Sequence, residues 1–175
     1  MNRRKVVILN RILFILFLFS LLGLLGFDIH LVSGSSMSPF LEQGDLVLSS
    51  PWIYGIPRIL SSGYIFRWKE VGHNDILVYN SPVENRVSIK RCVALPGDRV
   101  DFKEGFFFIN GEALPPAPHV PVGVFHDGFL DSEAYFLMGD NSRYSLDSRT
   151  YGPIKSDMII GKAVFTSGGG YGRKQ

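Results

Sequence analysis

One long apolar segment lies near the start of the chain. Residues 12–27 read ILFILFLFSLLGLLGF, where Ser20 is the only polar side chain and no residue is charged. With residues 6–9 included, a helix here would have about 22 residues and extend roughly 33 Å, enough to cross a hydrocarbon core of about 30 Å. The pattern therefore predicts a single N-terminal transmembrane helix.

The charges beside this segment predict its orientation. Basic residues at positions 3–5 precede it, Arg11 has a stem long enough to reach the headgroups, and Asp28 follows it. Basic residues on the near side favour a cytoplasmic N-terminus, with the rest of the chain outside the membrane. A cleavable secretory signal has the same basic and apolar parts. The sequence DIHLVSGSS that follows has no small-x-small site directly after the apolar run, which favours a retained anchor over residues 1–27.

Beyond residue 28 the apolar residues fall in short runs separated by Gly, Pro, Asn and Asp. This spacing is typical of strands and turns, and no run has helical periodicity. The predicted strands are Asp45–Leu48, Asp75–Tyr79, Val87–Leu95, Arg99–Phe102, Gly105–Ile109, Tyr135–Met138 and Asp157–Phe165. Short Gly-containing connections predict a hairpin over residues 99–109 and a second tight turn at Asn110-Gly111.

These strands predict a mainly β, extracytoplasmic domain over residues 28–166, antiparallel and folded over or partly closed into a barrel. Residues 51–72 and 113–131 do not fit a strand pattern and are predicted to be loops. Residues 167–175, SGGGYGRKQ, are rich in glycine, which predicts a flexible tail.

The distribution of charge excludes one class of function. Four of the 18 basic residues precede the first acidic residue, Asp28, and the 14 that remain stand against 16 acidic ones. A domain with this balance lacks the basic surface of a nucleic-acid-binding protein. The single cysteine, Cys92, cannot form an intrachain disulfide, so cysteine content does not identify the compartment.

Three polar clusters are candidates for catalysis. The first is SGSSMSP at residues 33–39, whose Ser36 comes nine residues after the apolar segment. Small side chains and a glycine let a substrate backbone approach closely, and the proline fixes the chain after the turn. A serine-rich juxtamembrane linker would have the same composition, so this cluster alone is not specific.

The second cluster lies on the predicted strand 87–95. Strand alternation puts Ser88, Lys90, Cys92 and Ala94 on one face, so small side chains flank the lysine. A lysine acts as a base only when it is neutral, and burial lowers its pKa toward neutrality. A strand lysine that points to solvent would have no such role.

The third cluster is GDNSRYSLDSR at residues 139–149, followed by Tyr151-Gly152-Pro153. Its density of hydroxyl, carboxylate and guanidinium groups is too high for a core strand. It is either a hydrogen-bonded surface loop with an ion pair between Asp147 and Arg149, or part of a catalytic site.

In this order the three clusters resemble the conserved boxes of bacterial signal peptidase I, a serine/lysine-dyad peptidase family. SSMSPFLEQGDLVL is similar to the family's serine box, IKRCVALPGD to its lysine box and MGDNSRYSLDSRTYG to its closing box. The likeness extends from the apolar segment to about Phe165.

The resemblance implies a role for each residue of the site. Ser36 would be the nucleophile and Lys90 its general base, with Ser145 hydrogen-bonded to the lysine. The other implied site residues support the site and the oxyanion (Gly34, Ser35, Asp147, Arg149) or position the substrate (Met37, Pro39).

One position departs from part of the family. Some members carry a hydroxyl residue two positions before the nucleophile that helps to stabilise the oxyanion, whereas this chain has Gly34 there. The expected oxyanion donor is therefore the backbone N–H of Ser36.

The function that the resemblance implies is removal of signal peptides from exported preproteins through an acyl-enzyme, at the cell (inner) membrane and without a metal or organic cofactor. The expected partners are signal peptides and the lipid bilayer, with no nucleic acid, and contact with the export machinery is left open. Three alternatives remain. They are a specialised peptidase for pilin or conjugation proteins, a membrane-tethered β domain that only binds partners, and a histidine-based serine protease using His30, His73, His119 or His126.

Overall fold

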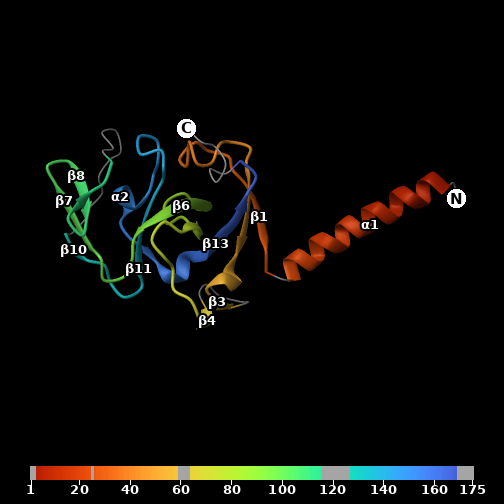
Figure 1. Cartoon of the computed structure of the whole chain (residues 1–175), viewed down its shortest axis with the longest axis horizontal. Coiled ribbons are helices and arrows are strands. Elements are labelled where there is room, and N and C mark those ends of the chain that lie inside the picture. Colours follow the sequence, from red (N-terminus) through yellow and green to blue (C-terminus); the bar gives the residue numbers. More distant parts are fainter. Residues whose placement is uncertain (1–2, 25, 59–63, 116–126, 169–175) are drawn as a thin grey trace.

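The computed structural model describes residues 3–24, 26–58, 64–115 and 127–168. It begins with helix α1, Arg3–Leu24, which extends away from the rest of the chain (Figure 1). Apolar side chains along α1 are exposed, as for Phe14 at 66% and Phe17 at 63%. The predicted N-terminal helix is confirmed, and it starts within the basic residues that precede the apolar run.

Within the described residues, no helix is both long enough and apolar enough to be assigned as a membrane-crossing segment. The transmembrane part of the prediction is therefore not confirmed.

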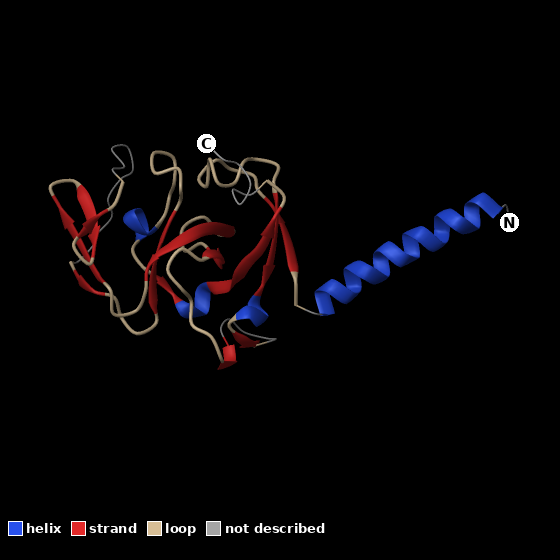
Figure 2. Ribbon diagram, viewed as in Figure 1, coloured by secondary structure: helices blue, strands red, loops and turns tan. Residues whose placement is uncertain are grey.

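The largest sheet in the described ranges has seven strands in the order β1-β2-β13-β5-β6-β11-β12, and every pair is antiparallel. Figure 2 shows the strands gathered in one part of the molecule, away from the long N-terminal helix. Its strands are β1 (Asp28–Leu31), β2 (Leu46–Ser50), β5 (Ile76–Asn80), β6 (Val87–Ala94), β11 (Ala134–Met138), β12 (Ile154–Lys155) and β13 (Ile159–Thr166). This order brings β6 between β5 and β11, so the second sequence cluster lies beside the strand that leads into the third. The mainly β, antiparallel prediction is confirmed.

Two smaller sheets complete the described β structure. One has the order β10-β7-β8-β9, and the other pairs β3 with β4. Their strands are β3 (Gly55–Pro57), β4 (Tyr64–Arg67), β7 (Arg99–Lys103), β8 (Phe106–Ile109), β9 (Glu112–Ala113) and β10 (Gly128–Phe129). The predicted β7–β8 hairpin and the turn after it are confirmed, and Asn110 and Gly111 take φ values of 52° and 87° there. Asn-Gly is the residue pair that tolerates such left-handed backbone best.

The prediction of two long loops is wrong in part. Residues 51–72 contain η1 (Pro51–Ile53), β3 and β4, and residues 113–131 contain β10. These strands are short, and β4 exposes both of its central side chains, so no alternation of apolar and polar residues reveals it. Residues 59–63 and 116–126 of these stretches, and 169–175 of the predicted tail, lie outside the described residues.

Five more short elements were not predicted from the sequence pattern. They are β1, β9, β12, α2 (Ser148–Tyr151) and η2 (Ser156–Met158). Each has four residues or fewer, which is too short for a periodicity to be read.

Candidate active site

Lys90 is buried because of its place on β6. Burial alternates along this strand, and the buried face carries Ser88, Lys90, Cys92 and Ala94, as the sequence alternation predicted. Lys90 is 4% exposed. Its Nζ lies 2.7 Å from Ser36 Oγ and 3.2 Å from the carbonyl oxygen of Ile89. The fold thus joins two groups that are 54 residues apart in the chain.

The surroundings of Lys90 lower its pKa. The main cause is burial, since the charged amine loses its water. The negative charges of Asp147 and Glu84 act in the opposite direction but do not reverse the shift. The amine therefore gives up its proton more readily than an exposed lysine, which is what a general base requires.

Ser36 lies on a loop between β1 and β2 that we call the serine loop, residues 32–45. Its base is closed by two backbone hydrogen bonds, Val32 N–H to Asp45 O at 2.9 Å and Gly44 N–H to Val32 O at 2.8 Å. Met37 and Leu41 are 2% and 0% exposed, and they pack in one apolar cluster with residues of β2 and β5. Burial of each such side chain stabilises the folded state by about 1.5–3 kcal/mol. This burial therefore stabilises the packing of the loop against the sheet.

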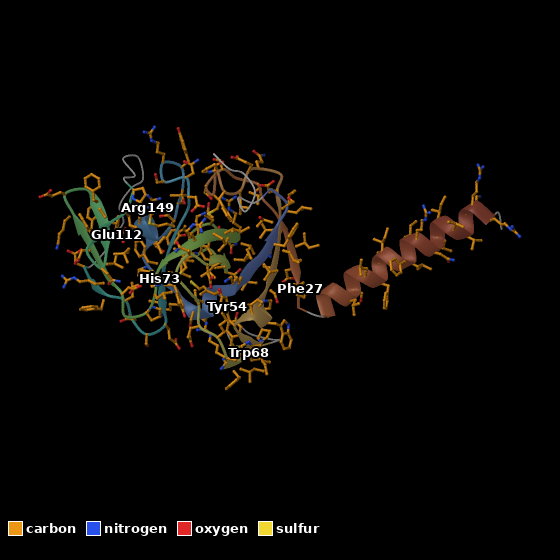
Figure 3. All side chains as sticks on the ribbon, in the orientation of Figure 1. Phe27, Tyr54, Trp68, His73, Glu112 and Arg149 are labelled. Atoms are coloured by element: carbon orange, nitrogen blue, oxygen red, sulfur yellow. The ribbon has the colours of Figure 1, made fainter. Side chains whose placement is uncertain are left out.

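The closing loop, residues 139–149, connects β11 to α2 and is organised by a buried ion pair. Arg149 donates from Nε to Asp147 Oδ1 at 2.8 Å and from Nη2 to Oδ2 at 2.7 Å. Figure 3 labels Arg149 within the β domain. Both residues are buried, at 0% and 2% exposure for Asp147 and Arg149. Asp147 also accepts the backbone N–H of Gly139 at 3.0 Å, and Ser148 Oγ accepts that of Leu137 at 2.9 Å. These bonds fasten the loop to the end of β11.

The structure does not form the hydrogen bond predicted between Ser145 and Lys90. Ser145 Oγ is buried and has no hydrogen-bond partner in the described part of the chain. The Lys90 amine is instead within reach of Ser36 Oγ and Ile89 O. Ser145 packs against Gly139, where an added Cβ would meet Ser145 Oγ at 2.2 Å and the Ser36 carbonyl oxygen at 2.4 Å. This part of the prediction is wrong, although Ser145 lies beside the serine backbone.

Asn141 links the closing loop to the serine loop. Its backbone N–H donates to Ser36 O at 3.0 Å, and its side-chain Nδ2 donates to Ser35 O at 3.0 Å. Asn141 belongs to the closing motif, but the motif predicted no role for it. Nothing in the sequence showed that its amide would reach a segment 106 residues away.

Asp140 and Arg91 tie the same loop to β6. Arg91 donates from Nε to Asp140 Oδ1 at 2.8 Å and from Nη2 to Oδ2 at 2.7 Å. The guanidinium of Arg91 also lies 4.9 Å from the centre of the Phe40 ring in the serine loop. The three sequence clusters are therefore connected directly. The order of the three clusters along the chain did not predict the contacts of Arg91 with Asp140 and with Phe40.

A cleft of about 450 Å³ opens beside Ser36 and Lys90. One wall is residues 29–37, the other is residues 84 and 86–90, and Tyr144 and Leu146 of the closing loop also line it. Glu84, which the sequence analysis did not single out, accepts hydrogen bonds from Arg86 Nη2 at 2.6 Å and from Ser88 Oγ at 3.1 Å. The cleft is thus mixed in polarity and open to an extended chain.

The remaining predicted site residues divide between the cleft and its surroundings. Gly34, Ser35 and Met37 line the cleft, and Met37 also belongs to the apolar cluster beneath the loop. Pro39 is exposed and does not line the cleft. Its role in positioning substrate stays a prediction.

No histidine in the described ranges contacts Ser36. His30 Nε2 lies 2.9 Å from Ser49 Oγ, and His73 Nε2 lies 2.7 Å from Asp98 Oδ2. His119 and His126 lie outside the described residues. The described residues also contain no group of three or more His, Cys, Asp and Glu side chains that could hold a metal ion.

Comparisons with known proteins identify the family. Residues 5–167 match the family described as signal peptidase, peptidase S26. Signal peptidase I V of Bacillus subtilis is 30% identical over 146 residues, which cover 74% of this chain and 79% of that protein. Signal peptidase I of Bacillus caldolyticus is 30% identical over 160 residues, covering 82% and 81%. The probable signal peptidase I-1 of Synechocystis sp. is 32% identical over 149 residues, covering 77% and 67%.

The predicted resemblance is confirmed, since the family match includes the segments that carry Ser36, Lys90 and the closing loop. This chain belongs to the signal peptidase family, peptidase S26, and is a serine peptidase of the signal peptidase I kind.

Proposed function

We propose that the protein is a membrane-attached endopeptidase that removes signal peptides from exported preproteins through a Ser36/Lys90 dyad. The observation that carries the proposal is the 2.7 Å separation of Lys90 Nζ and Ser36 Oγ, with the lysine 4% exposed. A buried amine with a lowered pKa beside a hydroxyl is an arrangement that activates the hydroxyl as a nucleophile.

The reaction proceeds in two halves. Neutral Lys90 takes the proton of the Ser36 hydroxyl while Oγ attacks the scissile carbonyl carbon, and the negative charge moves to the carbonyl oxygen. As the tetrahedral intermediate collapses, the C–N bond breaks and Lys90 returns the proton to the leaving amine. A water molecule then gives a proton to Lys90 and attacks the ester carbon, and Ser36 Oγ takes that proton as it leaves.

The closing loop keeps the two reacting groups in place. The buried Asp147–Arg149 pair holds the loop to β11, and the loop in turn contacts the backbone of Ser36 through Gly139 and Asn141. Ser145 supports the site by packing at this contact. A proton transfer over 2.7 Å is sensitive to small displacements, so residues that touch neither reacting atom still affect the rate.

The proposed substrate is the extended end of a signal peptide, with small side chains next to the scissile bond. The relatives named above are signal peptidases. The cleft beside Ser36 is about 450 Å³ in volume, toward the lower part of the range of roughly 300–1,000 Å³ for ligand pockets. A site of this size admits an extended backbone but restricts side chains close to Ser36.

We place the enzyme at the cell membrane, with its N-terminus on the cytoplasmic side and its β domain on the outer side. Basic residues 3–5 before the apolar residues of α1, and Asp28 after them, support this orientation. The exposed apolar side chains of α1 are suited to contact with lipid. Attachment of enzyme and preprotein to one bilayer raises their effective concentration.

The dyad is tested by Ser36→Ala and Lys90→Ala, assayed for cleavage of a model preprotein in detergent. Each variant should lose about 10³-fold or more of the wild-type rate, because the nucleophile and base act as a unit. Ser132→Ala and Lys103→Ala change exposed residues that do not line the cleft, and they should cleave at the wild-type rate.

Near-normal turnover by either dyad variant would refute the proposal. A protein that only binds partners would show no cleavage in any variant. A histidine-based protease would keep activity in Lys90→Ala and lose it in a histidine variant such as His30→Ala.

A further inference from the structure

The oxyanion of the proposed reaction needs hydrogen-bond donors, and the serine loop has few to offer. Gly34 has no side chain, and an added Cβ there would meet nothing within 4 Å. In the described part of the chain, neither the backbone N–H of Ser36 nor that of Met37 donates a hydrogen bond within the protein. These two N–H groups are therefore the available donors on this side of the cleft.

The direction of an N–H group is fixed by the carbonyl of the same peptide unit. In a trans peptide the C=O and N–H groups point to opposite sides. The peptide bonds that join Ser35 to Ser36 and Ser36 to Met37 are trans, since the cis bond of this loop is Ser38–Pro39. Whatever holds the carbonyls of Ser35 and Ser36 thus determines where the next two N–H groups point.

Asn141 donates to both of these carbonyls. Its Nδ2 donates to Ser35 O and its backbone N–H donates to Ser36 O, each at 3.0 Å. The Ser35 carbonyl oxygen also accepts the backbone N–H of Ser38 at 3.1 Å, within the serine loop. Ser35 and Ser36 line the cleft, whereas Asn141 does not. The carbonyls are therefore drawn away from the cleft, and the N–H groups of Ser36 and Met37 are turned toward it.

Asp140, the residue before Asn141, fixes the position of Asn141 in the structure. Asp140 is held by two hydrogen bonds from Arg91, at 2.8 and 2.7 Å, and Arg91 follows Lys90 on β6. Asn141 is thus positioned by the same strand that positions the general base. The oxyanion donors and the Lys90 amine therefore keep a fixed position relative to each other.

We propose that Asn141 is the positioning residue of the oxyanion site, where it turns the Ser36 and Met37 N–H groups into the cleft. It takes no part in proton transfer and does not touch substrate. The inference rests on the proposed function of Ser36 as nucleophile.

The test compares Asn141→Asp and Asn141→Ala with wild type in the full-length enzyme. Asn141→Asp keeps the size and the backbone hydrogen bond but places a carboxylate against the Ser35 carbonyl, so the peptide unit rotates. Loss of a single oxyanion donor costs about 10²–10³ in kcat, and a misdirected donor should cost roughly 10–100-fold. KM for a signal-peptide substrate should stay within about threefold, because the interaction develops only in the transition state.

Two further readouts separate positioning from a merely structural role. A peptide aldehyde that ends in small residues forms a hemiacetal with Ser36 whose oxygen occupies the oxyanion site, so its affinity should fall by the same factor as kcat/KM. The acidic limb of the pH profile, which reports Lys90, should be unchanged in Asn141→Ala. Arg143→Ala, an exposed change in the same loop, serves as the control and should match wild type in every readout.

The outcomes decide between this inference and the function on which it rests. A kcat within threefold of wild type for Asn141→Asp, or a loss carried by KM alone, would overturn the positioning role. If the melting temperature of Asn141→Ala is well below that of wild type, the positioning role is judged from Asn141→Asp alone. The fold of that variant is checked by its own melting temperature. Full activity of Ser36→Ala would instead remove the proposed function itself.

Discussion

Single side chains in this protein carry the chemistry through where they are buried and what charge lies beside them. Lys90 is surrounded by small buried neighbours on β6, and this burial lowers the pKa of its amine. The carboxylates of Asp147 and Glu84 raise that pKa in part. The pKa of this proposed base therefore depends on desolvation, which lowers it, on the two carboxylates, which raise it, and on the nearby Arg86 and Arg149, which lower it.

The pH dependence of cleavage should follow the charge at position 84. Only neutral Lys90 accepts the serine proton, so kcat/KM rises with pH through the lysine pKa. Glu84→Gln removes a negative charge that raises this pKa, so the acidic limb of the profile should move to lower pH. The measurement is kcat/KM against pH, with Glu112→Gln, an exposed change on β9, as the control. A shift to higher pH, or an equal shift in the control, would contradict the assignment.

Gly139 should tolerate no larger residue. A Cβ at this position would lie 2.2 Å from Ser145 Oγ and 2.4 Å from the Ser36 carbonyl oxygen, so the serine loop must move. Gly139→Ala should reduce kcat by about 100-fold, since a displacement of about 1 Å can cost that much. Gly23→Ala, where an added Cβ meets nothing within 4 Å, should leave peptide cleavage in detergent unchanged. Retention of the wild-type rate in Gly139→Ala would show that the loop adapts.

Among the structural elements, the connection from β11 through the closing loop to α2 does most to assemble the site. Asp147 caps the start of α2, where its side chain accepts the backbone N–H of Arg149 at 3.2 Å. It also binds the Arg149 guanidinium and the Gly139 N–H. One buried carboxylate thus orders both ends of the loop that contacts Ser36.

Removal of the Arg149 side chain should destabilise this connection strongly. Arg149→Ala leaves Asp147 buried without its charge partner, which should lower the free energy of unfolding by about 3–5 kcal/mol. Urea unfolding followed by fluorescence measures this change. Arg149→Lys keeps the charge but not the two-point contact. Its free energy of unfolding should lie between those of wild type and Arg149→Ala. Arg99→Ala, which breaks a surface pair with Asp101, should have little effect, and an equal loss there would contradict the argument.

The molecule as a whole combines an outlying helix with a β domain in which distant chain segments meet. Figure 1 shows α1 extending away from the sheets, while the site lies within the β domain. The cleft takes its lining from residues 29–37, from residues near the start of β6 and from the closing loop. The proposed attachment through α1 and the proposed catalysis therefore belong to separate parts of the protein, and we expect that each can be altered independently.

A charge in α1 should release the protein from the membrane without affecting the dyad. Leu16 is 59% exposed, and an aspartate in the middle of an apolar helix costs about 2.5–3.5 kcal/mol in a bilayer. Leu16→Asp should therefore lower the fraction that stays with carbonate-washed membranes, and Leu16→Ala should not. Cleavage of a peptide in detergent should be the same in both. Unchanged membrane retention of Leu16→Asp would count against attachment through α1.

Much of the fold could be predicted from local pattern, but only where elements are long enough. β6 has eight residues, and its alternation identified the strand and the residues that share a face with Lys90, whereas the burial of that face is seen only in the structure. β3, β4 and β10 have two to four residues and no readable pattern of their own; β3 and β4 pair with each other, and β10 pairs with the edge of β7. A membrane-crossing helix was also predicted from the apolar run and is not confirmed.

The amino-acid order alone identified the family, the β class of the domain, and Ser36 and Lys90 as candidate site residues, because motifs and strand alternation are local properties. Tertiary structure decided which groups meet. The 2.7 Å approach of Lys90 to Ser36, the missing partner of Ser145 and the reach of Asn141 to Ser35 all depend on segments 54 to 106 residues apart or on packing around them. Such contacts depend on how strands pair and loops pack, and a short stretch of sequence does not encode that pairing.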